Sequence, residues 1–254
     1  MKTPALLAGL SVVVLGCSAS PSSEVARPAP GPPDPQPEVI ERHRAQFAEE
    51  LSQRPPGSNE EQVAASYILG FLQQAGYPGR LDGVPVADLV RSTNVIGTPP
   101  EGATPEYLVA VPYGTPPNQA LDARSLGVFL EVARALSVRA LEHPVEFVAL
   151  GAEFAEQGKG TLGSIAMASL LREESFEPQV IYLSPVLSGD AFHAQGPLAS
   201  EFEPDVAANE PPMHQVARAA ADVYRNEEFD VTIVDGDAAE VADTLVAFLS
   251  ETLR

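Results

Sequence analysis

The order of hydrophobic patterns along the chain constrains its fold more than any other feature. Short apolar runs alternate with longer segments whose apolar residues recur at helical spacing. The short runs are typical of strands buried on both faces, and the longer segments are typical of amphipathic helices. Strands joined by helices form a mostly parallel sheet with helices on both faces. The sequence therefore predicts an α/β fold with three layers, α/β/α, around a central mixed sheet that is mostly parallel.

The pattern also predicts where strands end and where functional residues gather. Predicted strands cover residues 93–96, 107–111, 145–150 and 180–183, and predicted helices cover 38–51, a segment ending at Gly76, 125–137, 165–172, 214–224 and 238–253. Sheets of this type place their chemistry at the carboxyl ends of the strands. We therefore expect Val111, Leu150 and Leu183 to end neighbouring strands at the same edge of the sheet.

The first residues resemble a bacterial lipoprotein signal. Met1-Lys2-Thr3 is weakly cationic, and the apolar run of residues 4–15 is too short to span a bilayer. Val14-Leu15-Gly16-Cys17 then resembles a lipobox, in which the cysteine is lipidated and the chain is cut just before it. Cys17 is the only cysteine, so lipidation would account for an unpaired thiol in an exported protein. A simple secretory signal with an incidental cysteine is the alternative.

These features divide the chain into three parts. Residues 1–16 are predicted to be the lipoprotein signal peptide, 17–37 a proline-rich tether, and 38–254 the folded domain. Ser18 after the cysteine is similar to outer-membrane sorting signals, so we expect a lipid-anchored protein of the cell envelope, at the outer membrane and facing the periplasm or the exterior. The membrane would be a partner through the anchor. A formal net charge of −20 disfavours nucleic acid as a partner.

Five segments stand in order along about residues 54–183: Arg54-Pro-Pro-Gly57-Ser58, Pro112-Tyr113-Gly114 after a strand, Ala120-Leu121-Asp122-Ala123-Arg124-Ser125, the run from Val145 to Glu153, and Leu162-Gly163-Ser164. Together these segments resemble the zinc aminopeptidases of the M-28 peptidase family. This resemblance implies a fold like that of the zinc exopeptidases. Members of this family use two zinc ions, held by histidine and carboxylate ligands, to acidify a water molecule.

Carried over position by position, the resemblance implies that most metal ligands are replaced. The first histidine falls on Pro112, the carboxylate that bridges the zinc ions on Asp122, the general base on Glu153, its metal-binding neighbour on Phe154, and the next aspartate on Ser184. The last histidine would lie in the C-terminal region, where His193 and His214 occur. Asp122 is then the only dependable ligand position and Glu153 a vestigial general-base position. No bound cofactor is expected, although related proteins bind zinc.

Simpler interpretations of the same residues stay open. A second register would place the glutamate pair at Ala155-Glu156, which keeps one ligand and loses the base. Asp122 just before a helix is also a natural N-cap residue. Glu153 is alternatively a solvated loop carboxylate.

The sequence thus leads to three hypotheses about function. The first is a membrane-anchored lipoprotein with an M-28 peptidase-like domain, a pseudoenzyme that binds a peptide or protein in or near the former cleft. The alternative is an active metal-dependent aminopeptidase or hydrolase with a site rebuilt from Asp122, Glu153 and His193. The third is a structural envelope lipoprotein without a ligand. Metal analysis separates the second hypothesis from the other two, because every catalytic version requires bound metal.

Overall fold

A computed structural model of the chain describes residues 33–156, 160–202 and 214–250 and contains a seven-stranded sheet. The strand order is β1-β2-β4-β3-β5-β7-β6, with β3, β4, β5 and β7 parallel to one another and β1, β2 and β6 antiparallel to their neighbours. The strands are β1 (Gly79–Ala87), β2 (Val90–Gly97), β3 (Tyr107–Pro112), β4 (Val145–Leu150), β5 (Gln179–Leu183), β6 (His193–Gln195) and β7 (Val231–Asp235). The predicted mixed, mostly parallel sheet is confirmed.

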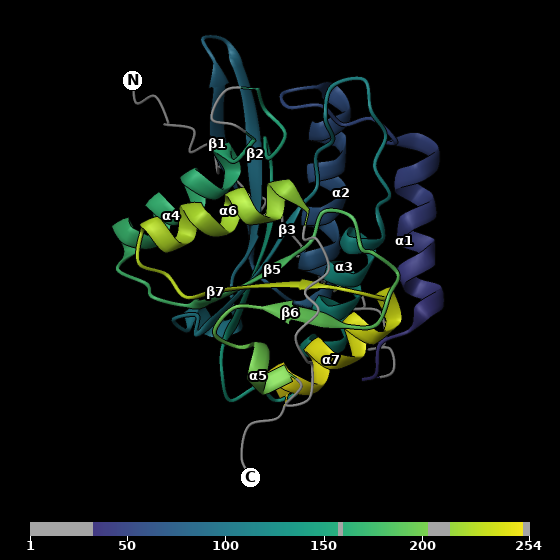
Figure 1. Cartoon of the computed structure of the whole chain (residues 1–254), viewed down its shortest axis with the longest axis vertical. Coiled ribbons are helices and arrows are strands. Elements are labelled where there is room, and N and C mark those ends of the chain that lie inside the picture. The colour runs from purple at the N-terminus through teal and green to yellow at the C-terminus, as the bar shows by residue number, and fades with distance from the viewer. Residues whose placement is uncertain (1–32, 157–159, 203–213, 251–254) are drawn as a thin grey trace, which may run out of the picture.

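Helices cover both faces of this sheet, which confirms the predicted three layers. The helices are α1 (Pro37–Glu50), α2 (Asn59–Ala75), α3 (Arg124–Ser137), α4 (Leu162–Glu174), α5 (Ala199–Phe202), α6 (Gln215–Asn226) and α7 (Ala238–Ser250), with a short 3-10 turn at Pro100–Gly102. Helices α1, α2, α3 and α7 share one hydrophobic core with the sheet, and α4 and α6 share the other. Figure 1 shows the first set on the right and below, and α4 and α6 on the left.

Strand β3 lies between β4 and β5 in the sheet, so the carboxyl ends of these three strands lie side by side. Val111 pairs with Ala149, the residue before Leu150, and Ala110 pairs with Tyr182, the residue before Leu183. Because the three strands are parallel, Val111, Leu150 and Leu183 end at one edge of the sheet, as predicted. We call this edge the carboxyl edge.

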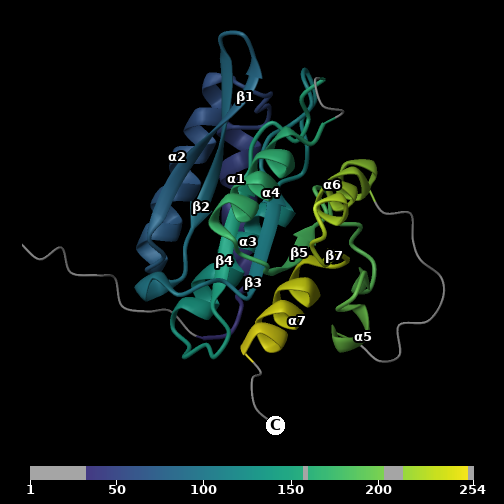
Figure 2. The same ribbon diagram turned by 90° about the vertical axis from the view of Figure 1, so that its left-hand side faces the viewer.

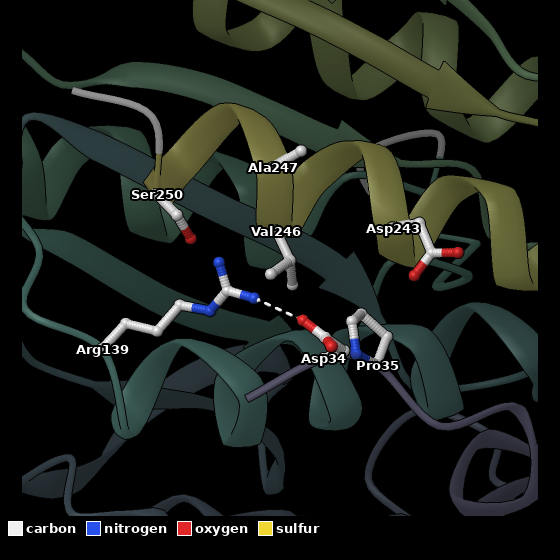
Figure 3. A pocket seen from close by; sticks show the side chains of 7 residues that line it. All are labelled: Asp34, Pro35, Arg139, Asp243, Val246, Ala247 and Ser250. Carbon is white, nitrogen blue, oxygen red and sulfur yellow. Dashed lines mark hydrogen bonds and ion pairs between the residues drawn. The ribbon is translucent and has the colours of Figure 1, made fainter. Parts of the chain in front are cut away.

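The chain is attached to the domain from Asp34 onward, before the predicted boundary at residue 38. The Gln36 amide donates a hydrogen bond of 2.7 Å to Oε1 of Glu131 in α3. Asp34 forms an ion pair of 3.0 Å with Arg139, beyond the end of α3. Figure 3 shows this pair at a cavity of about 330 Å³ that Val246 and other residues of α7 also line.

This attachment lies at the opposite edge of the sheet from the carboxyl edge. Helix α3 follows β3 and returns to the start of β4, so its last turn lies near the amino ends of the strands. The ring of Tyr107, the first residue of β3, accordingly packs 5.5 Å from the ring of Phe248 in α7. Residues 1–32, with the predicted signal peptide, Cys17 and most of the tether, lie outside the described residues. Within the described ranges, no helix has the length and apolar character to cross a membrane.

Candidate functional site

A cavity of about 370 Å³ opens at the carboxyl edge between the loop that follows β4 and the first turns of α6. We call it the carboxyl-edge cavity, and it is lined by Pro116, Glu153, Phe154, Ala155, Glu156, Gly160, Gln215, Val216 and Ala219. Its volume lies in the range of small-ligand pockets, and most of its lining side chains are apolar, as is usual for such pockets. It is the candidate binding site of the domain.

A buried arginine positions the loop that follows β3. Arg54 is 2% exposed, and its Nε donates a hydrogen bond of 2.6 Å to the carbonyl oxygen of Tyr113. Its amide donates to the Thr115 hydroxyl at 2.8 Å, and the Thr115 amide donates back to the Arg54 carbonyl oxygen at 2.9 Å. These contacts hold the chain that leads from β3 to Pro116 at the cavity.

A buried glutamate positions the loop that follows β4 in the same way. Glu61 of α2 is 1% exposed and accepts hydrogen bonds from the Gly57 amide at 2.6 Å and the Ala152 amide at 3.1 Å. Burial raises the pKa of Glu61, although these hydrogen bonds and the charge of Arg54 oppose the shift. The segment from Arg54 to Ser58, quoted above for the family resemblance, therefore connects both loops of the carboxyl edge.

Glu153 points into the protein rather than into solvent. Its side chain is fully buried and accepts hydrogen bonds from the Ser164 amide (2.7 Å), the Ser164 hydroxyl (3.0 Å) and the Tyr182 hydroxyl (2.9 Å). Burial raises the pKa of Glu153 to about 7, against the effect of these hydrogen bonds. The interpretation as a solvated loop carboxylate is therefore wrong. Both carboxylate oxygens already accept hydrogen bonds from α4 or β5.

Asp122 is held by two arginines. Arg44 of α1 places its Nε 3.2 Å from both carboxylate oxygens, and the Arg124 amide donates to Oδ1 at 2.9 Å. The Arg124 guanidinium lies 3.5 Å from Oδ2. The N-cap residue of α3 is Ala123 rather than Asp122, but the Asp122 carboxylate still satisfies an amide of the first turn. Asp122 does not line the carboxyl-edge cavity.

The other positions compared with metal ligands offer few side-chain atoms that could coordinate a metal ion. Pro112 ends β3, where it pairs with Leu150. Ser184 is fully buried, and its hydroxyl donates to the Val186 carbonyl oxygen at 3.0 Å. Phe154 lines the cavity with an apolar ring.

The two C-terminal histidines both lie near Asp235. His193 of β6 places its Nε2 3.8 Å from Oδ2 of Asp235 in β7, and His214 accepts a hydrogen bond of 3.2 Å from the Val216 amide at the start of α6. Burial lowers the pKa of His214, and the charge of Asp235 opposes this shift. In the parts of the chain that the structure describes, no three His, Cys, Asp or Glu side chains are grouped so that they could hold a metal ion. The described side chains therefore do not fit a pair of zinc ions.

Replacing Asp122 by alanine is expected to lower the free energy of unfolding by only about 1 kcal/mol. The change removes one capping interaction of α3 and ion pairs that are partly exposed. Urea unfolding of the wild-type protein and Asp122→Ala would measure the difference, and Arg44→Met should cost a similar or smaller amount. A loss above about 3 kcal/mol, the range of buried charge networks, would contradict this assignment.

Comparison with known proteins shows the fold alone. No protein-family model and no curated protein sequence matches the chain. Among solved structures, a leucine aminopeptidase precursor from Bacteroides thetaiotaomicron aligns with 13% identity and a TM-score of 0.69, covering 88% of this chain and 99% of that one. The LapA aminopeptidase of Legionella pneumophila aligns with 11% identity and a TM-score of 0.67, covering 85% and 71%. A glutaminyl cyclase from Porphyromonas gingivalis aligns with 15% identity and a TM-score of 0.66, covering 85% and 96%. The chain therefore has the α/β fold of the zinc-dependent exopeptidase and glutaminyl cyclase structures.

Proposed function

We propose that this protein is a lipid-anchored envelope protein whose aminopeptidase-like domain is non-catalytic and binds a peptide or protein partner in the carboxyl-edge cavity. The observation that carries this proposal is the pairing of Asp122 with Arg44. Of the positions compared with the zinc ligands of related proteins, Asp122 alone keeps a carboxylate, and a guanidinium contacts both of its oxygens. A metal ion would have to displace this cation and would remain close to its positive charge.

The hydrolase alternative gains less support from the same geometry. A site rebuilt from Asp122, Glu153 and His193 would need their side chains to converge on one reacting atom. Each of them instead contacts its own partners: Arg44 for Asp122, Ser164 and Tyr182 for Glu153, and Asp235 for His193. We therefore assign binding rather than hydrolysis to the cavity.

The purified protein is expected to contain no stoichiometric zinc and to lack chelator-sensitive activity. Hydrolysis of aminoacyl substrates should not exceed the background rate, because a water molecule that is not bound to a metal is not acidified. Cyclisation of N-terminal glutamine, in which the α-amine attacks the side-chain amide, should not exceed it either, because no metal would polarise the amide carbonyl. Elemental analysis after dialysis and assays with and without added zinc would test both points.

The matched controls for this experiment are Asp122→Ala and Glu153→Gln. One or more tightly bound zinc ions per chain, with activity lost in either variant, would overturn the proposal in favour of a rebuilt enzyme. Equal and negligible rates in all three proteins would support it.

The position of the N-terminal segment is compatible with this role. The segment is fixed at the amino edge of the sheet by Asp34 and Gln36, whereas the cavity opens at the carboxyl edge. A lipid at Cys17 would then be joined to the domain at the end remote from the cavity. A partner could reach the cavity without displacing the anchor.

The Cys17→Ser variant is expected to lose lipidation and cleavage before residue 17, and with them membrane attachment. Expression in a diderm bacterium, followed by membrane fractionation and mass spectrometry of the N-terminus, would measure both. Replacing Ser18 by alanine is the control and should leave lipidation unchanged. A Cys17→Ser protein that is still membrane-bound and cut at the same place would show that the lipoprotein assignment is wrong.

A further inference from the structure

Exposed apolar side chains are concentrated on the hairpin formed by β1 and β2. Six large apolar residues are exposed in the described part of the chain: Val63, Leu81, Leu89, Val90, Val138 and Ile165. Three of the six lie in this hairpin, and Leu89 at its tip is 98% exposed. Apolar residues that gather on one element mark an interaction surface more often than residues scattered singly.

The hairpin projects beyond the carboxyl edge. Strands β1 and β2 pair from Gly97 back to Val90, whereas β4 pairs with β2 only from Val95 to Gly97. Val95 is opposite Ala149, next to the last residue of β4, so the distal part of the hairpin extends past the end of that strand. Figures 1 and 2 show the tip at the top of the molecule. The tip and the carboxyl-edge cavity therefore lie at the same edge of the sheet.

The hairpin also packs directly against the loop that lines the cavity. Val84 is 1% exposed and forms a small apolar cluster with Ala152 and Ala155, against which Val86 packs as well. Ala155 also lines the carboxyl-edge cavity. The hairpin and the cavity therefore adjoin each other through the loop that follows β4.

The charges at this edge favour a cationic ligand. Asp88 at the hairpin tip and Glu156 at the cavity are exposed, and no lysine or arginine is among the described residues that line the cavity. Arg91 is an exposed cation near the tip. The whole chain has 35 acidic against 15 basic residues, so its field attracts cations and repels anions.

We infer that the hairpin tip and the carboxyl-edge cavity form one docking surface for a cationic segment of a partner protein. One apolar side chain of that segment fills the cavity, a second contacts Leu89, and flanking lysine or arginine residues lie near Glu156 and Asp88. This inference rests on the proposed binding function and adds the chemistry of the partner and a second point of contact.

The test uses the purified full-length chain and an array of synthetic 12-residue peptides. Each peptide carries two large apolar residues, flanked by lysine and arginine in one set, by serine in a second and by aspartate and glutamate in a third. The basic set should bind at least about tenfold more tightly than the acidic set, and high salt should reduce this difference. Leu89→Asn, which removes the apolar contact without adding charge, should weaken binding of the basic set about tenfold or more. Val138→Asn, an equivalent change at an exposed residue at the end of α3, should leave binding unchanged.

Variants that fill the cavity distinguish a failure of the proposed binding function from a failure of the docking-surface inference. Ala219→Trp should abolish binding of every peptide, and Gln215→Trp at the exposed rim should do the same if the first variant unfolds on thermal denaturation. Absence of binding to all three sets, or binding that neither cavity variant changes, would overturn the proposed function. Binding that is lost in the cavity variants but shows no preference for basic peptides, or is unchanged in Leu89→Asn, would overturn this inference alone.

Discussion

Replacing Arg54 by methionine is expected to lower the free energy of unfolding by about 3–5 kcal/mol, the range for removing one member of a buried network of charged and hydrogen-bonded groups. Methionine keeps most of the apolar stem of the arginine side chain. It lacks the guanidinium, which lies 5.3 Å from the ring centre of Phe47 in the wild-type protein. It cannot donate to the carbonyl oxygens of Leu51 and Tyr113, which would lose their buried partner. The buried carboxylate of Glu61 would also lose the positive charge that stabilises it.

A double-mutant cycle identifies the source of this loss. Combined with Glu61→Gln, Arg54→Met should cost less than the sum of the two single changes by about 1–3 kcal/mol, because the neutral amide no longer needs the cation. Arg91→Met removes an exposed arginine of β2 and should change stability by no more than about 0.5 kcal/mol. Urea unfolding of the four variants would measure these values. Strict additivity of Arg54→Met and Glu61→Gln would contradict the coupling described for the carboxyl edge.

The second large effect is a dependence of stability on pH that comes from Glu153. Its pKa is raised to about 7 in the folded protein by burial, from an ordinary value of 4.5. The folded state therefore retains a proton that the unfolded chain releases. The stabilisation is fully present below pH 4.5 and is lost as the pH rises to about 7. At about 1.4 kcal/mol for each pKa unit, the loss amounts to about 3 kcal/mol.

Glu153→Gln removes this titration and nearly preserves the shape of the side chain. The difference in unfolding free energy between the wild-type protein and Glu153→Gln should fall by about 3 kcal/mol from pH 4.5 to pH 7. Other buried groups titrate in both proteins and cancel in this difference. Burial raises the pKa of Glu146 to about 7, which acts in the same direction, and lowers the pKa of His43 to about 4, which acts in the opposite direction. Parallel stability curves for the two proteins would show that Glu153 is not a buried titrating group.

The elements that the sequence failed to predict have weak local signals or lie outside the recognised motifs. Strand β1 contains Gly79, Gly83 and Pro85, which lower strand propensity, and β6 is only three residues long. Strand β7, with the sequence Val-Thr-Ile-Val-Asp, carries a clear β-branched signal that could have been found between the last two predicted helices. The β1–β2 hairpin was therefore predicted only in part, through the strand expected over residues 93–96 of β2, and its partner β1 was missed.

The candidate site, like the fold, was predicted from the sequence only in part. The order of motifs placed Glu153 and Phe154 after β4, and the structure places both at the carboxyl-edge cavity. The partners of Asp122 and Glu153 were not predictable, because Arg44 is 78 residues from Asp122 and Tyr182 is 29 residues from Glu153. Nothing in the local sequence indicates which buried hydroxyl or guanidinium will reach a given carboxylate.

By itself, the sequence determined the α/β architecture, the shared edge of the three parallel strands and the absence of metal-binding side-chain atoms at Pro112 and Phe154. These properties depend on hydrophobic periodicity and on the chemical nature of single residues, which are local. Only the tertiary structure decided that Asp122 pairs with Arg44 and that Glu153 is buried. Both depend on how distant segments pack together, because burial and partner distance set the charge state and availability of a carboxylate, and neither quantity is encoded in the neighbouring residues.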